Sequence, residues 1–402
     1  MFSKVPHYPG DPIYTLVEAF QKDARQDKVS LSIGVYCNET GKVPYMQAVQ
    51  SAERLIAENF GARPYLPMEG MERLRFVTQR LLFGDKSEAL QSARIATVQT
   101  VGASGALRLG ADFLNYHLAC KKVWVSDFTW EAHQDIFQAS GYEVSRYPYY
   151  DAKTGGVDFD ALRVTVEKMD AKDVIILHAC AHNPTGADLS REQWVELVAT
   201  MVRKGVIPFL DLAYQGFAKG LEDDAFAVRA LLSANAEFLI ANSFSKNFAL
   251  YGERVGALSV VCQTASEAEA VLGQLKSGAR KSYSSPSTHG ARVVVEVLEN
   301  QALTQIWRSE LEIMRKRVIA MRTQLHAALE TKVGSGSVDY LVKQSGMFSF
   351  TGLSTRQIDA LRNEFGVYLV GTGRICIAGL TDNNVSYVAD AMAHVMVNEK
   401  SY

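Results

Sequence analysis

Short, almost continuous apolar runs recur along this chain and alternate with segments that have helical spacing. Seven of these runs have the length of a strand: residues 94–99, 122–126, 143–148, 174–179, 207–212, 238–243 and 257–262. An apolar run without alternating polar positions is typical of a strand that is buried on both faces. Such strands, separated by helices, predict an α/β fold in which helices cover a mostly parallel sheet.

Apolar residues at steps of three and four predict helices at residues 45–60, 190–204, 301–330 and 384–397. Ser190 and Gln193 fit a capping box at the start of the second of these helices. The third is longer than usual, and we expect it to bridge from the sheet domain to a second domain. That second domain would hold strands near 346–351 and 374–378. The first 12 residues contain three prolines and predict an extended arm.

The composition excludes several classes of protein. The chain has 402 residues, 48% of them hydrophobic, and a net charge of −2, which argues against nucleic-acid or anionic-membrane binding. The five cysteines are scattered, which fits reduced thiols in the cytosol and predicts neither disulfides nor a metal site: Cys37, Cys120, Cys180, Cys262 and Cys376. No signal peptide or membrane span is visible, so we expect a cytoplasmic protein.

Three of the predicted strands end in the same way, with polar residues directly after the apolar run. These ends are HACAHNPTG (178–186), DLAYQGF (211–217) and NSFSKNF (242–248). In open α/β sheets, ligands bind outside the carboxyl ends of the strands. The three ends therefore predict one composite site.

A further segment, residues 99–114, predicts a strand, a loop of small residues and an amphipathic helix. The N–H groups at the start of such a helix, with the Ser104 hydroxyl, would suit a phosphate. A glycine-rich turn between a strand and a helix can also be only a tight connection.

Asp211 and Tyr214 lie three residues apart, directly after the strand at 207–212. A buried acid needs a partner. The alternative is an aspartate that caps the next turn.

Lys246 lies in a turn at the end of a strand, between apolar and hydroxyl residues. A desolvated lysine has a lowered pKa, and its free amine can form Schiff bases. Arg254 with Ser243 and Ser245 could bind a phosphate, because a guanidinium matches a phosphate with two parallel hydrogen bonds. The alternative is a lysine in a surface loop.

Together these groups match the needs of pyridoxal 5′-phosphate. An acid keeps the pyridine nitrogen protonated, so that the ring can accept electrons. A phenol can bind the ring oxygen, and a lysine can form the Schiff base.

Several motifs resemble those of the class I aminotransferases, and within them the aspartate and aromatic (tyrosine) group, especially its bacterial aromatic-amino-acid members. They are HNPTG (182–186), DLAYQGF (211–217), SFSKNFALYGERVG (243–256), YSSPSTHGA (283–291) and RICIAGL (374–380). The resemblance covers nearly the whole chain. It implies pyridoxal-phosphate fold type I, with a seven-stranded sheet, a smaller α/β domain and a homodimer with shared active sites. We expect an arm and part of the small domain at 1–45, the large domain at 46–313 and the small domain at 314–402.

The resemblance also implies roles for individual residues. Lys246 would form the Schiff base and move the substrate proton, while Asp211 would pair with the pyridine nitrogen. The remaining cofactor contacts would come from Tyr214 and Asn183 at the ring oxygen, Trp130 on the ring face, and Ala103, Ser104, Ser243, Ser245, Arg254 and the neighbouring subunit's Tyr65 at the phosphate.

Arg374 and Gly34 would bind the substrate α-carboxylate, to which Trp130 and Asn183 also contribute. Arg280 of the partner subunit would bind a distal carboxylate, although it could instead be a surface arginine at a helix end. His133 and His178 would surround Asp211, with ordinary core histidines as the alternative.

Five positions differ from aspartate-specific relatives by smaller or less polar residues: Cys37, Val43, Pro64, Ser104 and Ser285. Fewer buried donors are then left unpaired when an apolar ring enters the pocket. We therefore expect transfer of the amino group of phenylalanine, tyrosine or tryptophan to 2-oxoglutarate by a ping-pong reaction, with aspartate and glutamate also accepted. The alternatives are an aspartate aminotransferase with aromatic side activity, or another fold-type-I enzyme such as a decarboxylase.

Overall fold

The computed structural model describes residues 2–8, 10–59 and 61–398 of the chain. The chain divides into two compact units, which are described separately. The central unit comprises Pro44–Asn183 and Ala187–Lys316, and the terminal unit comprises Met1–Val43, Pro184–Gly186 and Arg317–Tyr402. The terminal unit thus combines segments from both ends of the chain.

A seven-stranded sheet forms the middle of the central unit, in the order β2-β10-β9-β8-β7-β3-β4. β10 runs antiparallel to β2 and β9, and the other neighbouring strands are parallel. The mostly parallel sheet and its seven strands are therefore confirmed. The strands are β2 (Ile95–Val101), β3 (Lys122–Ser126), β4 (Glu143–Tyr147), β7 (Val174–His178), β8 (Ile207–Leu212), β9 (Phe238–Ser243) and β10 (Val255–Val261).

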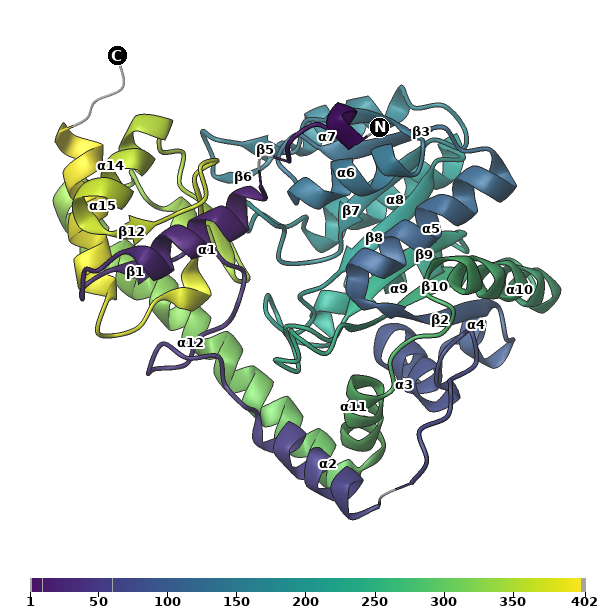
Figure 1. Ribbon diagram of the computed structural model, residues 1–402. Helices are drawn as coiled ribbons and strands as arrows, with labels where there is room; N and C mark the ends of the chain where they lie inside the picture. The colour runs from purple at the N-terminus through teal and green to yellow at the C-terminus, as the bar shows by residue number, and fades with distance from the viewer. Residues whose placement is uncertain (1, 9, 60, 399–402) are drawn as a thin grey trace. The chain divides into compact units, whose positions relative to one another are not determined.

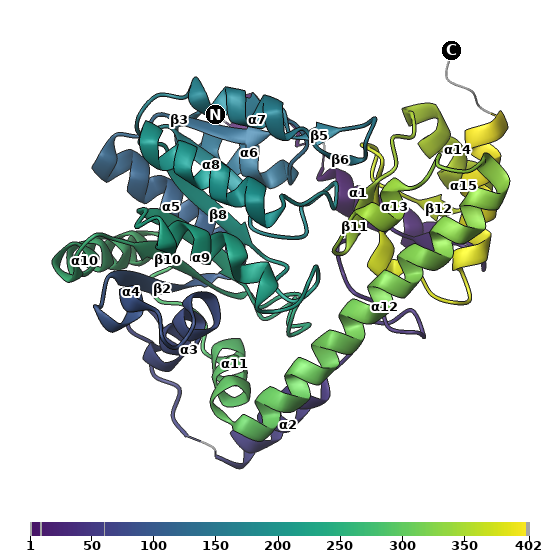
Figure 2. The same cartoon turned by 180° about the vertical axis from the view of Figure 1, so that it is seen from behind.

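Helices cover both faces of this sheet. α5 (Gly102–Leu118) and α6 (Glu131–Ala139) lie on the face seen in Figure 1. α8 (Arg191–Lys204) and α9 (Phe226–Ser233) lie on the face seen in Figure 2. Every residue of β7, β9 and β10 is buried, which explains why these strands are apolar on both faces.

The predicted helices of the central unit are confirmed, with small shifts at their ends. Ser190 and Gln193 form the expected capping box of α8, which ends at Gly205 with φ +67°. The helix expected over 45–60 is α2 (Gln47–Glu58), and Phe60 lies outside the described residues. The other elements here are α3 (Glu72–Phe83), α4 (Glu88–Gln91), β5 (Tyr150–Asp151), β6 (Gly156–Val157), α7 (Phe159–Glu167), η2 (Asp223–Ala225), α10 (Ala265–Ser282) and α11 (His289–Glu299).

The long helix expected over 301–330 is α12 (Gln301–Val333). Its residues up to Lys316 belong to the central unit, and those from Arg317 belong to the terminal unit. One uninterrupted helix therefore contributes to both units.

The terminal unit contains two small sheets and several helices. β11 (Phe348–Phe350) pairs antiparallel with β13 (Arg374–Cys376), and β1 (Val29–Ser30) pairs parallel with β12 (Val367–Tyr368). The strands expected near 346–351 and 374–378 and the last helix are thus confirmed. The helices of this unit are η1 (Phe2–Lys4), α1 (Pro12–Lys22), α13 (Tyr340–Lys343), α14 (Thr355–Phe365), η3 (Ile377–Gly379) and α15 (Val385–Asn398).

The prediction of an extended arm over the first 12 residues, of which Met1 and Pro9 lie outside the described residues, was wrong in part. Residues 2–4 form a short 3-10 helix, and α1 begins at Pro12. Asp11 caps α1 by accepting hydrogen bonds from the N–H groups of Ile13 and Tyr14, at 2.8 and 3.0 Å. Proline is tolerated in the first turn of a helix because its missing N–H would have no partner there.

We find no helix within residues 2–8, 10–59 and 61–398 that combines the length and apolar composition needed to cross a membrane.

Candidate active site

The register of the parallel strands brings polar strand ends together in the central unit. His178 of β7 lies directly opposite Asp211 of β8. In the next pair of strands, Leu212 of β8 lies opposite Asn242 of β9. Because parallel strands end at the same edge of a sheet, the segments that follow all start there. The three strand ends are therefore neighbours, as their apolar runs predicted.

Asp211 is the buried acid at this edge, with 3% of its surface exposed. Its Oδ2 lies 3.0 Å from His133 Nε2, and His133 Nδ1 lies 2.8 Å from Thr129 Oγ1. The ring of His178 is 5.1 Å from that of His133. Asp211 therefore has a histidine as its partner, and the two histidines lie around it as expected.

The other oxygen of Asp211 is a buried acceptor. Its Oδ1 receives no hydrogen bond within the described parts of the chain. Burial acts to raise the pKa of Asp211, but the hydrogen bond from His133 and the electrostatic interaction with it, together with a smaller contribution from Lys246, lower the pKa below its usual value. The site thus holds a carboxylate with one oxygen able to accept a hydrogen bond from a ligand.

Lys246, Tyr214 and Asn183 form the next layer of the site. Lys246 is half-buried, and its Nζ lies 4.8 Å from the centre of the Tyr214 ring. Asn183 Nδ2 donates to the Tyr214 hydroxyl at 3.3 Å. These contacts exclude a lysine fully solvated in a surface loop, since its amine faces a buried phenol ring.

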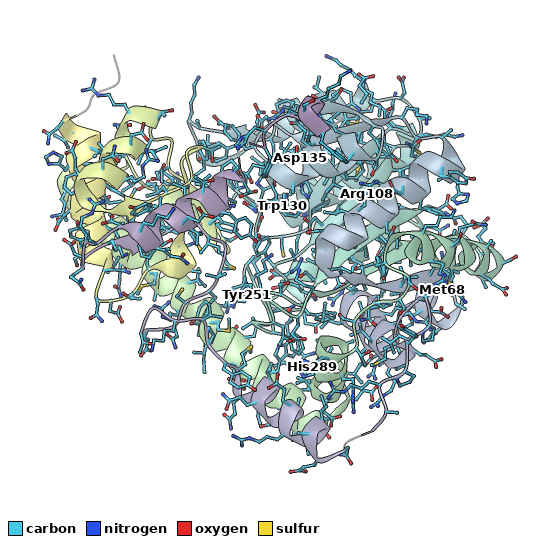
Figure 3. The ribbon with its side chains drawn as sticks, in the orientation of Figure 1. Met68, Arg108, Trp130, Asp135, Tyr251 and His289 are labelled. Carbon is cyan, nitrogen blue, oxygen red and sulfur yellow. The ribbon has the colours of Figure 1, made fainter. Side chains whose placement is uncertain are left out.

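Trp130 lies immediately before α6, in the loop that follows β3 (Figure 3). Its ring is 5.4 Å from that of His133 and nearly perpendicular to it. The tryptophan therefore contacts the histidine that binds Asp211. We call this group of residues the Asp211 cluster: Asn183, Asp211, His133, His178, Lys246, Trp130 and Tyr214.

The segment at 99–114 differs from the expected strand, loop and helix. β2 ends at Val101 and α5 starts at Gly102, so the small residues form the first turn of the helix. Gly102 has φ +64°, and a Cβ there would lie 2.7 Å from Arg254 Nη2. Glycine adopts this φ without strain, and its missing side chain leaves room for the Arg254 guanidinium.

The basic and hydroxyl residues gather beside this turn. Gly102 N donates to the backbone oxygen of Arg254 at 3.0 Å, and Arg254 Nη1 donates to Ser245 Oγ at 3.3 Å. Ser243 Oγ accepts from Ser245 N at 3.1 Å. Ala103 and Ser104 follow in the first turn of α5. A helix N-terminus beside an arginine and hydroxyl groups is a suitable place for a phosphate.

Tyr65 and Arg280 are placed differently from the other predicted residues of this unit. Tyr65 lies between α2 and α3 and is 95% exposed. Arg280 is exposed in the last turn of α10, where its Nη1 donates to Ser284 Oγ. Within the described residues, neither makes a hydrogen bond or ring contact with the Asp211 cluster.

Arg374 and Gly34 belong to the terminal unit. Arg374 is only 2% exposed; its Nη2 donates to Ser32 O at 2.6 Å, and its Cζ lies 4.5 Å from the centre of the Phe348 ring. A Cβ on Gly34 would lie 2.8 Å from the same ring. Both predicted residues therefore contact one phenylalanine.

Sequence reasoning missed three residues that support the site. Thr129 contacts His133, while Asp188 and Asp224 accept backbone N–H groups from the loops after β7 and β8. No local pattern separates Asp224 from Asp223 beside it. Their importance depends on which loops they reach in the folded chain.

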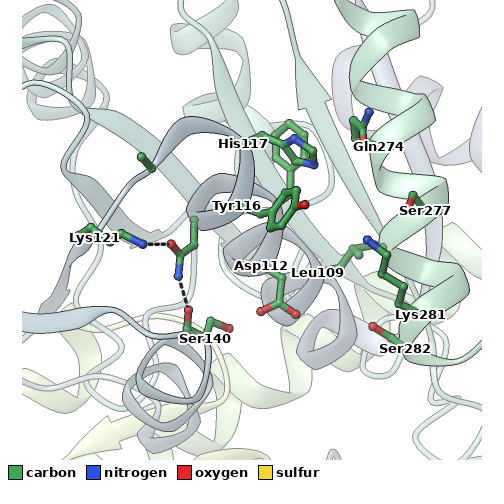
Figure 4. Close-up of a pocket in the computed structure, with 14 residues that line it drawn as sticks. Leu109, Asp112, Tyr116, His117, Lys121, Ser140, Gln274, Ser277, Lys281 and Ser282 are labelled. Carbon is green, nitrogen blue, oxygen red and sulfur yellow. Dashed lines mark hydrogen bonds between the residues drawn. The ribbon is translucent and has the colours of Figure 1, made fainter.

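A separate cavity of about 610 Å³ lies between α5 and α10 (Figure 4). Asp112, Tyr116 and His117 line one side, and Ser277 and Lys281 line the other. Tyr116 is 79% exposed. None of the predicted site residues lines this cavity.

Comparisons with known proteins identify relatives along almost the entire chain. The family "Aminotransferase class I and II" matches residues 26–392. The aromatic-amino-acid aminotransferase of Escherichia coli is 53% identical over 98% of this chain and 100% of its own length. The aspartate aminotransferase of Pseudomonas aeruginosa is 44% identical with the same coverage. A solved aromatic-amino-acid aminotransferase of Burkholderia pseudomallei, covalently bound to pyridoxal phosphate, is 45% identical with a TM-score of 0.96, covering 98% of this chain and 99% of that one.

His178 should make the protein sensitive to acid. Burial, with help from His133, lowers the pKa of His178 to about 3 from 6.5. Between these values the unfolded chain binds a proton that the folded chain does not, so stability is complete above pH 6.5 and falls as the pH decreases. From pH 6.5 to 4.5 the loss should be about 2–3 kcal/mol.

Urea unfolding should show that the His178→Asn variant loses less unfolding free energy over this pH range than wild type, by about 2–3 kcal/mol. The control is His117→Asn, which removes an exposed histidine instead. If His178→Asn and wild type lose stability in parallel, His178 is not buried in its neutral form.

Proposed function

This chain belongs to the class I and II aminotransferases, and we propose that it transfers the amino group of phenylalanine, tyrosine or tryptophan to 2-oxoglutarate. Aspartate and glutamate are further substrates. The observation that carries the proposal is the buried Asp211, whose Oδ1 receives no hydrogen bond among the described residues. The aromatic preference is supported by 53% identity to an aromatic-amino-acid aminotransferase, against 44% to an aspartate aminotransferase.

The residues of the central unit fit pyridoxal 5′-phosphate. The Asp211 Oδ1 suits a protonated pyridine nitrogen, because a buried carboxylate oxygen without a donor is costly. Tyr214 and Asn183 would hold the ring oxygen, and Trp130 would stack on the ring. The phosphate would be held by Ala103, Ser104, Ser243, Ser245 and Arg254. When bound, the cofactor withdraws electrons from the α-carbon of the substrate.

Lys246 is the group that we expect to move the proton. Its Nζ would bind the cofactor at rest, then take the proton from the substrate α-carbon as a free amine. The amine lies 4.8 Å from the centre of the Tyr214 ring, and Tyr214 is 5% exposed, so the ring covers one side of the amine. One lysine could thus serve both half-reactions, in which the first product leaves before the second substrate enters.

Arg374 and Gly34 would bind the α-carboxylate of the substrate. The Arg374 guanidinium is held by Ser32 O and the Phe348 ring, so little rotational freedom is left to lose on binding. A substrate carboxylate held by arginine favours cleavage of the covalent Cα–H bond over decarboxylation. Arg280 would bind the distal carboxylate of dicarboxylic substrates.

We further propose a homodimer in which each active site uses both chains. The support is that Tyr65 and Arg280 are exposed and make no contact with their own chain's Asp211 cluster within the described residues. The central unit would form the large cofactor-binding domain and the terminal unit the small domain. A cytoplasmic location is supported by five free, mostly buried cysteines.

Lys246→Ala should abolish transamination. Removing a general base costs typically about 10²–10⁴-fold, and here the covalent anchor is lost as well. Turnover of phenylalanine with 2-oxoglutarate measures the first effect. Mass spectrometry of the borohydride-reduced protein measures the second, with Lys168→Ala at the exposed end of α7 as control. Retained turnover or retained covalent cofactor in Lys246→Ala would assign the role to another lysine.

Subunit mixing tests the shared site. Arg280→Ala and Lys246→Ala chains are each defective, but a mixed dimer would contain one site with both residues intact. Dicarboxylate activity should therefore reappear after the two variants are unfolded and refolded together. Purified mixed dimers without regained activity would show that both residues serve the site of one chain.

Arg280→Leu should separate the two substrate classes. An unpaired buried carboxylate costs about 2–5 kcal/mol, so kcat/KM for aspartate should fall about 30- to several-thousand-fold. The phenylalanine half-reaction should change less than about tenfold, because its ring makes no charge pair. The measurement follows the cofactor absorbance in each single half-reaction, with Lys281→Leu as the neighbouring control. An equal fall for both substrates would mean that Arg280 does not select the side chain.

A further inference from the structure

Asp224 is a buried carboxylate that the proposed reaction does not use. It lies in the 3-10 helix η2, before α9, and is only 2% exposed. Its Oδ2 accepts the N–H groups of Gly216 and Ala218, at 2.8 and 3.1 Å, and its Oδ1 accepts that of Lys219 at 2.7 Å. One side chain thus binds three N–H groups within four residues of the loop after β8.

This loop carries Tyr214. Phe217 N donates to Tyr214 O at 3.0 Å. Tyr214 therefore belongs to the same turn as the N–H groups that Asp224 accepts. Gly216 has φ +100°, which L-residues rarely adopt. A turn of this shape leaves several N–H groups pointing inward, and buried N–H groups require acceptors. Asp224 supplies them.

The loop is also tied to the lysine segment. Asn247, the neighbour of Lys246, donates its Nδ2 to Gln215 O at 3.3 Å. The backbone oxygen of Asn247 accepts from Trp307 Nε1 at 2.7 Å. The loop that positions Tyr214 and the segment that positions Lys246 are therefore held against each other.

We infer that Asp224 is a positioning residue, which holds Tyr214 in place against Lys246 and Asn183 by fixing the backbone of residues 216–219. The inference rests on the proposed function of Tyr214 as a cofactor ligand. A similar arrangement occurs one strand away, where Asp188 accepts the N–H groups of Ala181 and His182, both at 2.9 Å. Asn183 follows His182 directly in the chain. The loops that carry Tyr214 and Asn183 are thus each bound by a carboxylate, Asp224 and Asp188 respectively.

The charge state of Asp224 agrees with this role. Burial raises its pKa to about 6, and nearby Asp188 acts in the same direction, while the three N–H bonds act to lower it. At neutral pH the group is therefore ionised and accepts hydrogen bonds at both oxygens. The two carboxylates border a common small cavity of about 30 Å³, together with Cys180.

The test is a double-mutant cycle between Asp224→Asn and Tyr214→Phe, read out as the dissociation constant of pyridoxal phosphate from the refolded, cofactor-depleted enzyme. The amide of asparagine keeps one acceptor oxygen, but its NH2 group replaces the other and faces at least one backbone N–H. Leaving that donor unpaired should weaken cofactor binding about tenfold. If Asp224 acts through the phenol, the same change in Tyr214→Phe should weaken binding less than about threefold, since the hydroxyl is already absent.

Asp223→Asn is the matched control, because it removes an adjacent charge that pairs with Arg191 at the surface. It should leave the dissociation constant unchanged. Hydrogen exchange of the amides of residues 214–219 in the holoenzyme should accelerate in Asp224→Asn and stay unchanged in the control. If Asp224→Asn does not fold, Asp224→Glu replaces it in the same cycle, because it keeps the charge but shifts the acceptors.

The outcomes separate the two hypotheses. Wild-type enzyme that does not bind pyridoxal phosphate, or whose affinity Tyr214→Phe leaves unchanged, contradicts the proposed function. A normal effect of Tyr214→Phe with fully additive losses in the cycle contradicts the positioning role, since Asp224 would then support the fold without acting through Tyr214.

Discussion

The negative charge of Asp211 must be compensated inside the protein, and much of the site is arranged around this requirement. A buried carboxylate without partners is strongly unfavourable. Here one oxygen is bound by His133, which is held in turn by Thr129, while His178 lies opposite on β7. The other oxygen has no donor in the described chain, so the free-energy cost of burying it is fully offset only when a ligand supplies a donor.

The sheet makes this arrangement possible because its parallel strands end at one edge. Loops that leave such an edge must turn sharply, and their inward N–H groups need acceptors. Asp188 and Asp224 provide acceptors for two neighbouring loops, next to Asn183 and Tyr214. Buried carboxylates that would lower stability as isolated charges thus order the backbone at the site.

Most of the sheet could be predicted from local pattern, because buried parallel strands need continuous apolar runs and their ends show as abrupt changes to polar residues. The cluster of Asp211, Tyr214 and Lys246 followed from the same logic. The turn at Gly102 was predicted less well. A loop was expected there, but the helix begins directly after β2, since glycine lets the chain turn into α5 without a connecting segment.

The sequence by itself determined where the apolar strands lie, which polar residues follow them, which of these are candidates for the site, and the family. It did so because burial and spacing leave a local signature. Only the tertiary structure decided that His133 binds Asp211, that Asp224 holds the loop of Tyr214, and that Tyr65 and Arg280 stay at the surface of their own chain. These relations join residues far apart in the chain, and hydrogen-bond partners across such distances depend on how loops are placed in space, which no local pattern encodes.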